Sequence, residues 1–155
     1  KTLPGLRAYE KAAVVAGGGV NQRIGLFDAF LIKENNVELA GGVAEAVQAA
    51  QRYRSDHLAD QVPDPLIEVE VQTLAQLADA ITAGAERVLL DNMDLPMLAE
   101  AVQITAGRAE LEASGGITRD TLRATAETGV DFISMGALTH SAPALDLSLT
   151  LTRTT

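Results

Sequence analysis

Glycines and a small polar residue follow two successive apolar runs. Ser114, Gly115 and Gly116 stand between such a run and a helix start, in the segment ASGGIT. Glycines let a backbone approach a ligand closely, and free amides at a helix N-terminus bind phosphate. A short connecting loop that needs positive φ would explain a lone SGG as well. Gly136 has the equivalent place after the next run, in SMGALTHS, and two adjacent strand ends of this kind favour a phosphate site.

Carboxylates lie at the ends of two other runs. Glu68 and Glu70 are two residues apart in LIEVEV, so a strand places both on one face and the intervening valines on the other. Asp91 ends the next run, RVLLDN. Carboxylate oxygens bind Mg²⁺ together with a phosphate substrate, or accept hydrogen bonds from sugar hydroxyls. We assign this function to Glu70 and Asp91, and interpret Glu68 as the structural partner of a buried lysine or arginine.

Cations lie in the first quarter of an otherwise acidic chain. They are Lys1, Arg7, Arg23 and Lys33. Lys33 ends the apolar run AFLI, where an unpaired ammonium would be costly, whereas Arg7 belongs to a helical pattern and is interpreted as a surface residue. Cations near a phosphate site would bind an anionic substrate, and a dicarboxylate fits them. His140, beside the second glycine segment, leaves ligand binding and helix capping equally open.

Short β-branched runs recur at a steady interval along the chain. They begin near Leu66, Arg87, Ala109 and Asp131, at intervals of 21, 22 and 22 residues. This is the length of one strand, one helix and two short loops, so a repeated βα unit is predicted. An earlier unit leads from FLIK through a glycine loop into a helix over residues 43–59, and Pro63 and Pro65 precede LIEVEV.

Capping residues and glycines mark the predicted helices. Helix starts are indicated by Thr73, Asp94 with Pro96, and Thr118, and helix ends by Gly84, Gly107 and Gly129. One more helix is predicted over residues 4–16, with Pro4 in its first turn.

Alternating strands and helices predict the α/β class with a parallel sheet. Periodicity does not decide between a doubly wound sheet and a barrel. Polar residues at several strand ends favour a barrel, because its loops converge on one face, whereas a doubly wound sheet concentrates its site at one switch point. Five runs at this interval do not complete a barrel of eight strands. We therefore expect an open or incomplete, TIM-like parallel α/β barrel that lacks its N-terminal part.

Composition excludes several classes of function. The chain has 155 residues, of which 47% are hydrophobic, as expected for one domain. A net charge of −9 and only 3% aromatic residues argue against binding nucleic acid or an anionic membrane. Cysteine is absent, which excludes disulfides and thiolate metal sites. With no apolar run long enough to span a membrane, a cytoplasmic protein is expected.

The ordered motifs resemble the barrel domain of the quinolinate phosphoribosyltransferase family. They are KTLPGLR, GGGVNQR, LIKENN, IEVEV, LLDNM, LEASGGI, TGVDFISMGALTHS and LDLSL, and they extend over nearly the whole chain. The resemblance implies an open barrel of roughly six to seven strands in the full protein. It also implies an α/β sandwich domain and a homodimer in which the neighbouring subunit supplies an arginine to the site. Residues 1–145 would form the barrel, and residues 146–155 would return towards the sandwich domain.

The resemblance implies phosphoribosyl transfer from phosphoribosyl pyrophosphate to quinolinate with decarboxylation, a step of NAD biosynthesis that needs Mg²⁺. Lys1, Glu70 and Asp91 would be catalytic. The family's cations around the substrates are matched by Lys1, Arg23 and Lys33. Its acidic pair, which contacts the ribose hydroxyls and holds Mg²⁺ directly or through water or substrate, is matched by Glu70 and Asp91. Its phosphate loops are matched by Ser114, Gly115, Gly116 and Gly136, with His140 nearby.

The sequence departs from the family pattern in three places. Gln22 stands where the family usually has histidine, so a polar contact rather than proton transfer is expected there. The arginine that usually precedes Lys1 and the sandwich domain are not in this sequence, so the chain alone is expected to be inactive. Two alternatives stay open. One is a paralogous phosphoribosyltransferase for another acid, such as the molybdenum-transport-associated relative, which the charge of Lys33 disfavours. The other is a non-catalytic barrel that binds a phosphorylated metabolite.

Overall fold

The computed structural model describes residues 1–60 and 64–153. Pro63, expected to precede a strand, lies outside the described residues. The chain divides into two compact units, of which the larger is Asn21–Met135 and the smaller combines Lys1–Val20 with Gly136–Thr155.

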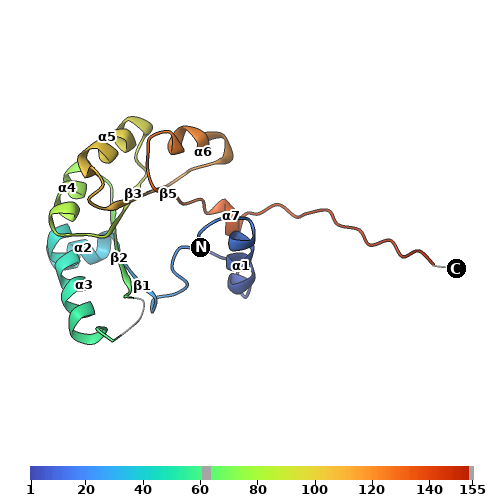
Figure 1. The fold of residues 1–155 in the computed structure, drawn as a ribbon, viewed down its shortest axis with the longest axis horizontal. Coiled ribbons are helices and arrows are strands. Elements are labelled where there is room, and N and C mark those ends of the chain that lie inside the picture. Colours follow the sequence, from blue (N-terminus) through green and yellow to red (C-terminus); the bar gives the residue numbers. More distant parts are fainter. Residues whose placement is uncertain (61–63, 154–155) are drawn as a thin grey trace. The chain divides into compact units, whose positions relative to one another are not determined.

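The larger unit is built on a parallel sheet (Figure 1). In the described part of this unit the strands are β1 (Ala29–Ile32), β2 (Leu66–Val71), β3 (Arg87–Asp91), β4 (Glu110–Ser114) and β5 (Phe132–Ile133). Their order in the sheet is their order in the chain, and every neighbouring pair is parallel. A doubly wound sheet would reverse its order at a switch point. The predicted incomplete parallel barrel is therefore confirmed.

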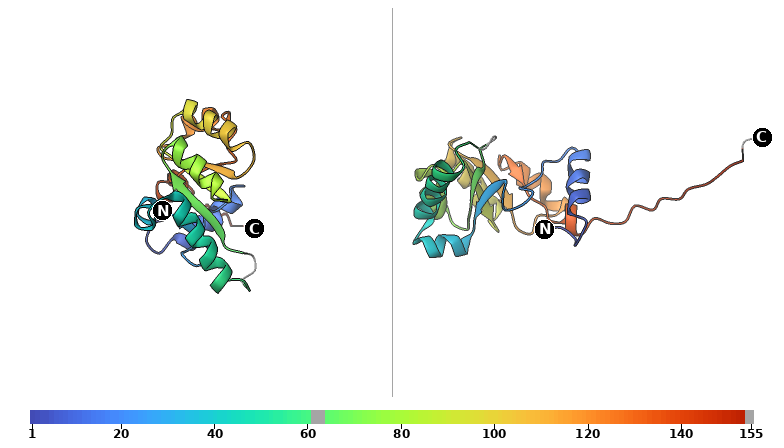
Figure 2. Two further views of the ribbon diagram at one scale, coloured as in Figure 1. Left: turned by 90° about the vertical axis from the view of Figure 1, so that its left-hand side faces the viewer. Right: turned by 90° about the horizontal axis from the view of Figure 1, so that it is seen from below.

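Helices cover one face of this sheet, as Figure 2 shows from the helical side. They are α2 (Glu34–Ala40), α3 (Val43–His57), α4 (Leu74–Thr82), α5 (Leu95–Thr105) and α6 (Arg119–Ala126). The predicted caps are present, because the side chains of Thr73, Asp94 and Thr118 each accept a hydrogen bond from a backbone N–H three residues later. Helix α2 was expected to be a loop. It is a short helix whose start is closed by Asn36, which accepts a hydrogen bond from the Lys33 amide at 2.9 Å.

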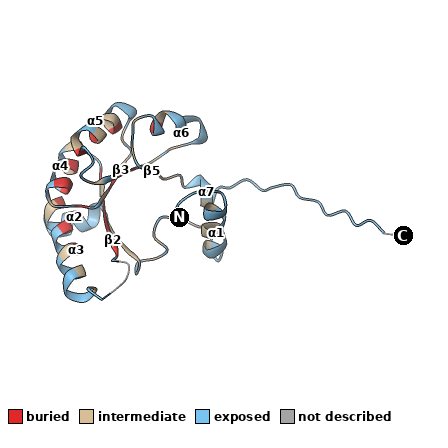
Figure 3. Cartoon of the chain, viewed as in Figure 1, coloured by how far each residue is buried: buried red, intermediate tan, exposed pale blue. Residues whose placement is uncertain are grey.

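The helix-covered face of the sheet holds the hydrophobic core (Figure 3). Alternate residues of β2 and β3 lie there, and Ile67, Val69, Val71, Val88 and Leu90 are each 0–1% exposed. They belong to one cluster with the apolar residues on the inner sides of α3, α4 and α5, such as Val47, Leu77 and Leu98. Because this face supplies the core, the opposite face of the sheet can carry polar residues.

The opposite face of the sheet is charged. Strand alternation and the parallel register place Glu68, Glu70, Arg87, Glu110 and Glu112 on it, and we call it the charged face. The interior of a parallel barrel is ordinarily filled with bulky branched side chains. Polar side chains in its place must find partners inside the protein, because burial without them is costly.

The smaller unit contains α1 (Arg7–Ala16) and α7 (Ala137–His140). Helix α1 begins later than predicted, since residues 4–6 form a turn, and α7 was not predicted. Residues 142–153 form neither helix nor strand, and Leu145, Leu147, Leu149 and Leu151 are 79–87% exposed.

Leu90→Ala should lower the free energy of unfolding by about 2–5 kcal/mol, because it opens a cavity in the core between sheet and helices. The matched variant Leu39→Ala, at a position that is 88% exposed on α2, should change it by less than about 0.5 kcal/mol. Urea unfolding of the two variants measures the difference, and equal losses would show that the helix-covered face is not the core.

Candidate functional site

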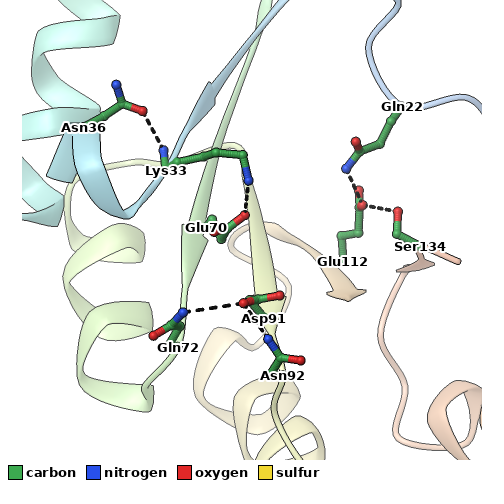
Figure 4. A network of polar contacts seen from close by, with 9 residues as sticks. All are labelled: Gln22, Lys33, Asn36, Glu70, Gln72, Asp91, Asn92, Glu112 and Ser134. Atoms are coloured by element: carbon green, nitrogen blue, oxygen red, sulfur yellow. Dashed lines mark hydrogen bonds and ion pairs between the residues drawn. The ribbon is translucent and has the colours of Figure 1, made fainter. Parts of the chain in front are cut away.

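Lys33, Glu70 and Asp91 meet at the carboxyl ends of β1, β2 and β3 (Figure 4). Lys33 Nζ lies 2.6 Å from Glu70 Oε2, and the Glu70 side chain is only 15% exposed. Asp91 Oδ2 accepts a hydrogen bond from Gln72 Nε2 at 3.5 Å. The structure thus brings one predicted cation and both predicted carboxylates to the same edge of the sheet. It also pairs the cation with one of the carboxylates. Because Lys33 is 53% exposed and Glu70 only 15%, the pair mainly offsets the burial of Glu70.

The glycine loop after β4 lies beside this edge. Ser114 is the register partner of Asp91 on the neighbouring strand. Gly115 and Gly116 have φ values of +97° and +62°, and a Cβ atom at Gly115 would overlap both the side chain and the backbone nitrogen of Asn92. Backbone conformation and close approach therefore both require glycine at 115. The loop has the form of a phosphate site, but positive φ alone also explains the glycines, so the phosphate remains a prediction.

Asn92 is a residue of this edge that the sequence analysis did not select. It has a left-handed backbone, with φ +56°, its Nδ2 donates to Asp91 Oδ2 at 2.8 Å, and its amide donates to the Ser114 carbonyl at 2.9 Å. Asparagine adopts this conformation more readily than most residues. The sequence feature that could have identified Asn92 is an asparagine directly after the aspartate that ends a strand. Asn92 links the acidic residue of β3 to the glycine loop of β4.

Two buried carboxyl groups lie further down the charged face. Glu68 is 5% exposed and Glu112 is 3% exposed. Burial, then repulsion by Glu112 and a hydrogen bond between the two carboxyls, raise the pKa of Glu68 to about 8, while Arg87 and Arg23 oppose this rise. The predicted partner of Glu68, a basic residue, is therefore only part of the answer, because its strongest neighbour is another carboxyl. With this raised pKa, Glu68 favours its protonated form at neutral pH.

The segment before β1 lies close to this pair. Gln22 Nε2 donates to Glu112 Oε1 at 2.8 Å, and Ser134 Oγ donates to the same oxygen at 2.5 Å (Figure 4). Arg23 Nη1 donates to the Ala29 carbonyl at 3.2 Å. Gln22 and Arg23, both predicted site residues, thus belong to the same unit as Lys33, Glu70 and Asp91.

Lys1, Gly136 and His140 belong to the smaller unit. The Lys1 carbonyl accepts a hydrogen bond from Thr139 Oγ1 of α7 at 2.5 Å. A Cβ atom at Gly136 would overlap the His140 imidazole, and His140 Nδ1 lies 2.7 Å from Ser141 Oγ. Gly136 has φ −60°, so its backbone conformation does not require glycine, and a Cβ atom there would have to displace only the exposed His140 ring. His140 makes no cap to α7, whose N-terminus has no side-chain cap.

The fold and the strand-end groups define the class of the protein. It is a parallel α/β barrel with acidic, basic and glycine-loop groups at the carboxyl ends of its strands. Residues 1–150 match the family model described as quinolinate phosphoribosyl transferase, C-terminal domain. The chain belongs to this family, and the resemblance seen in its motifs is confirmed.

Relatives agree with this assignment. The chain is 45% identical to the chloroplastic nicotinate-nucleotide pyrophosphorylase [carboxylating] of Oryza sativa, over 96% of this chain and 43% of that protein. It is 43% identical to the probable enzyme of the same name from Bacillus subtilis, over 98% and 50%. The solved nicotinate-nucleotide pyrophosphorylase of Francisella tularensis is similar with a TM-score of 0.86 and 48% identity, over 95% and 50%. The chain thus spans about half the length of these relatives.

Glu68→Gln should stabilise the protein at alkaline pH. The glutamine imitates the protonated acid. Because the pKa of Glu68 is raised from 4.5 to about 8 on folding, its contribution to stability is complete below 4.5 and is lost as pH rises towards about 8. Each pH unit in this window costs about 1.4 kcal/mol at most. The melting temperature of the variant should therefore gain on that of the wild type from about pH 5 to about pH 9. A difference that does not change with pH would contradict this.

Asn92→Ala should lower the free energy of unfolding by about 1–2 kcal/mol, because alanine is strained in the left-handed conformation. Asn92→Gly removes the same side chain without that strain. It is the matched control and should be clearly more stable than Asn92→Ala in urea unfolding. Equal losses in the two variants would show that the backbone of Asn92 carries no constraint.

Proposed function

We propose that this chain is the barrel of an enzyme that transfers the phosphoribosyl group of phosphoribosyl pyrophosphate to quinolinate, giving nicotinate mononucleotide, carbon dioxide and pyrophosphate. The family match over residues 1–150 supports it. So does the similarity to carboxylating nicotinate-nucleotide pyrophosphorylases. The observation that carries the proposal is the edge at which a cation, two carboxylates and a glycine loop meet.

Each group at this edge has a role in the proposed reaction. The backbone of Ser114, Gly115 and Gly116 binds the 5′-phosphate, as does the Gly136 segment. Glu70 and Asp91 accept hydrogen bonds from the ribose hydroxyls. As pyrophosphate leaves, positive charge develops at the anomeric carbon, and nearby carboxylates stabilise it while the pyridine nitrogen attacks.

The cations bind the acid substrate in this proposal. Lys33, Arg23 and Lys1 meet the two carboxylates of quinolinate and offset the negative charge left on the ring carbon when carbon dioxide departs. Gln22 contributes a polar contact, and His140 a contact near the Gly136 segment. The pair Lys33–Glu70, at 2.6 Å, adds a condition. Substrate binding would separate this ion pair. A quinolinate carboxylate would then become the partner of Lys33, and a ribose hydroxyl the partner of Glu70, so that both charges keep a partner.

Mg²⁺ is the proposed cofactor. Its residues would be Glu70 and Asp91, whose hard carboxylate oxygens fit the ion. Among the described residues no group of three or more histidine, cysteine, aspartate and glutamate side chains could hold a metal. The two carboxylates would therefore supply only part of the Mg²⁺ coordination shell, and water and substrate phosphate would complete it. When bound, the ion would neutralise charge on the departing pyrophosphate.

The proposed assembly is a homodimer whose second domain completes the site. Residues 145–151 present a leucine at every second position, and these leucines are 79–87% exposed. Alternation of this kind fits a strand that covers another sheet with one face, which supports the return of residues 146–155 to a sandwich domain. Among the described residues no helix is long and apolar enough to cross a membrane. A cytoplasmic location stays a prediction, since the rice relative is a chloroplastic protein.

Pyrophosphate release by the full-length protein tests the activity. With phosphoribosyl pyrophosphate and Mg²⁺, quinolinate should support release and nicotinate should not, because nicotinate lacks the second carboxylate that the cations of the site bind in this proposal. Release with a different acid alone would favour the paralogous transferase. No release with any acid, together with phosphate binding, would favour the non-catalytic barrel.

Glu70→Ala and Asp91→Ala should each lower kcat/KM by roughly 100-fold or more, because each removes charge that stabilises the transition state. Glu100→Ala, which removes an exposed carboxylate from α5, is the matched control and should leave kcat/KM within about twofold. Thermal unfolding is measured in parallel. Losses of stability in proportion to the losses of activity would refute the assignment of these two carboxylates.

A further inference from the structure

Glu112 joins three segments that are distant in the chain. Its Oε1 atom accepts hydrogen bonds from Gln22 Nε2, 90 residues earlier, and from Ser134 Oγ, 22 residues later. Glu112 is 3% exposed whereas Gln22 is an exposed residue, so the bonds are shielded from water at their Glu112 end. Hydrogen bonds to a carboxylate are stronger than neutral ones, and a low local dielectric strengthens them further.

Segment 21–28 depends on polar contacts for its position. It forms neither helix nor strand. Ile24 and Gly25 donate their amides to Asp28, each at 2.7 Å, which shapes the segment from within. Leu26 and Phe27 are 85% and 72% exposed, so burial of these large side chains does not anchor it within this chain. The bond from Gln22 to Glu112 ties the segment to the sheet.

Glu112 is itself held in place. Arg87 Nη1 lies 4.0 Å from Glu112 Oε2, and Arg87 is fixed by Glu110 at 2.6 Å and by the Phe132 ring, whose centroid is 4.1 Å from the guanidinium carbon. Glu68 lies against it from β2, joined by a hydrogen bond between the carboxyls. A group constrained on several sides can fix the position of a segment that is hydrogen-bonded to it.

We propose that Glu112 is a positioning residue, which holds segment 21–28 on the charged face so that Gln22 and Arg23 are in place for the anionic substrate. The position of the segment follows from the contacts of Glu112. The nature of the substrate rests on the proposed function.

Hydrogen exchange tests the position without reference to activity. In the full-length protein, Glu112→Ala should speed exchange of the backbone amides of residues 21–28 by roughly 10-fold or more, because the hydrogen bond that joins Gln22 to β4 is lost. Glu112→Gln keeps an oxygen that accepts both bonds and should retain protection. Glu110→Ala is the matched control, since Glu110 lies on the same strand and face and pairs with Arg87. It should leave exchange in residues 21–28 unchanged.

Gln22→Ala removes the same tie from the other end and leaves Glu112 in place, so it answers the question even if Glu112→Ala fails to fold. It should speed exchange of the same amides. Unchanged exchange in Gln22→Ala, or an equal increase in Glu110→Ala, would overturn the proposal.

Kinetics then test the consequence for the substrate. Glu112→Ala should raise KM for quinolinate by roughly 10- to 100-fold and lower kcat less, because misplacing binding groups by about 1 Å has effects of this size. Glu112→Gln should keep KM for quinolinate close to the wild-type value. The double variant Gln22→Ala/Glu112→Ala should be no worse than the worse single variant, because both substitutions remove the Gln22–Glu112 hydrogen bond that positions the segment. Additive effects would overturn the proposal, whereas a wild type without quinolinate-dependent pyrophosphate release would refute the proposed function and leave the exchange result standing.

Discussion

The structure depends on the division of one parallel sheet into two chemically opposite faces. In-register parallel pairing puts valine beside valine and leucine on one face, and glutamate beside arginine on the other. The valine face is covered by α3, α4 and α5 and supplies the core. This burial provides the stability that permits charged groups to be buried on the second face, where burial is costly unless each group finds a partner.

The cost of burying charged groups is offset in different ways at the middle and at the edge of the charged face. In the middle, burial and the neighbouring Glu112 raise the pKa of Glu68 to about 8, and Arg87 lies 4.0 Å from Glu112. At the carboxyl edge, Lys33 and Glu70 pair while Lys33 stays half exposed. The middle is therefore fixed, and the edge remains open to a ligand. Rigid support beneath an accessible edge is the arrangement that a binding site needs to hold its groups in place.

Backbone geometry at the edge is as constrained as its charges. Asn92 turns left-handed after β3, and its side chain fills the space that a Cβ atom at Gly115 would need. The acidic residue of one strand and the glycine loop of the next are therefore positioned together. A substitution in either loop would displace the other, although the two are separated by a whole helix in the chain.

The sequence by itself determined the α/β class, the places of most helices and strands, and the edge residues Lys33, Glu70, Asp91 and Ser114, because strand period, capping residues and strand-end positions are local properties. It missed α2 and α7, which are too short to show a helical period, and it missed Asn92. Only the tertiary structure decided that Lys33 pairs with Glu70, that Glu68 faces another carboxyl, and that Glu112 holds Gln22 from 90 residues away. These pairings depend on distances across the sheet and on desolvation, and neither is encoded in the spacing of residues along a chain.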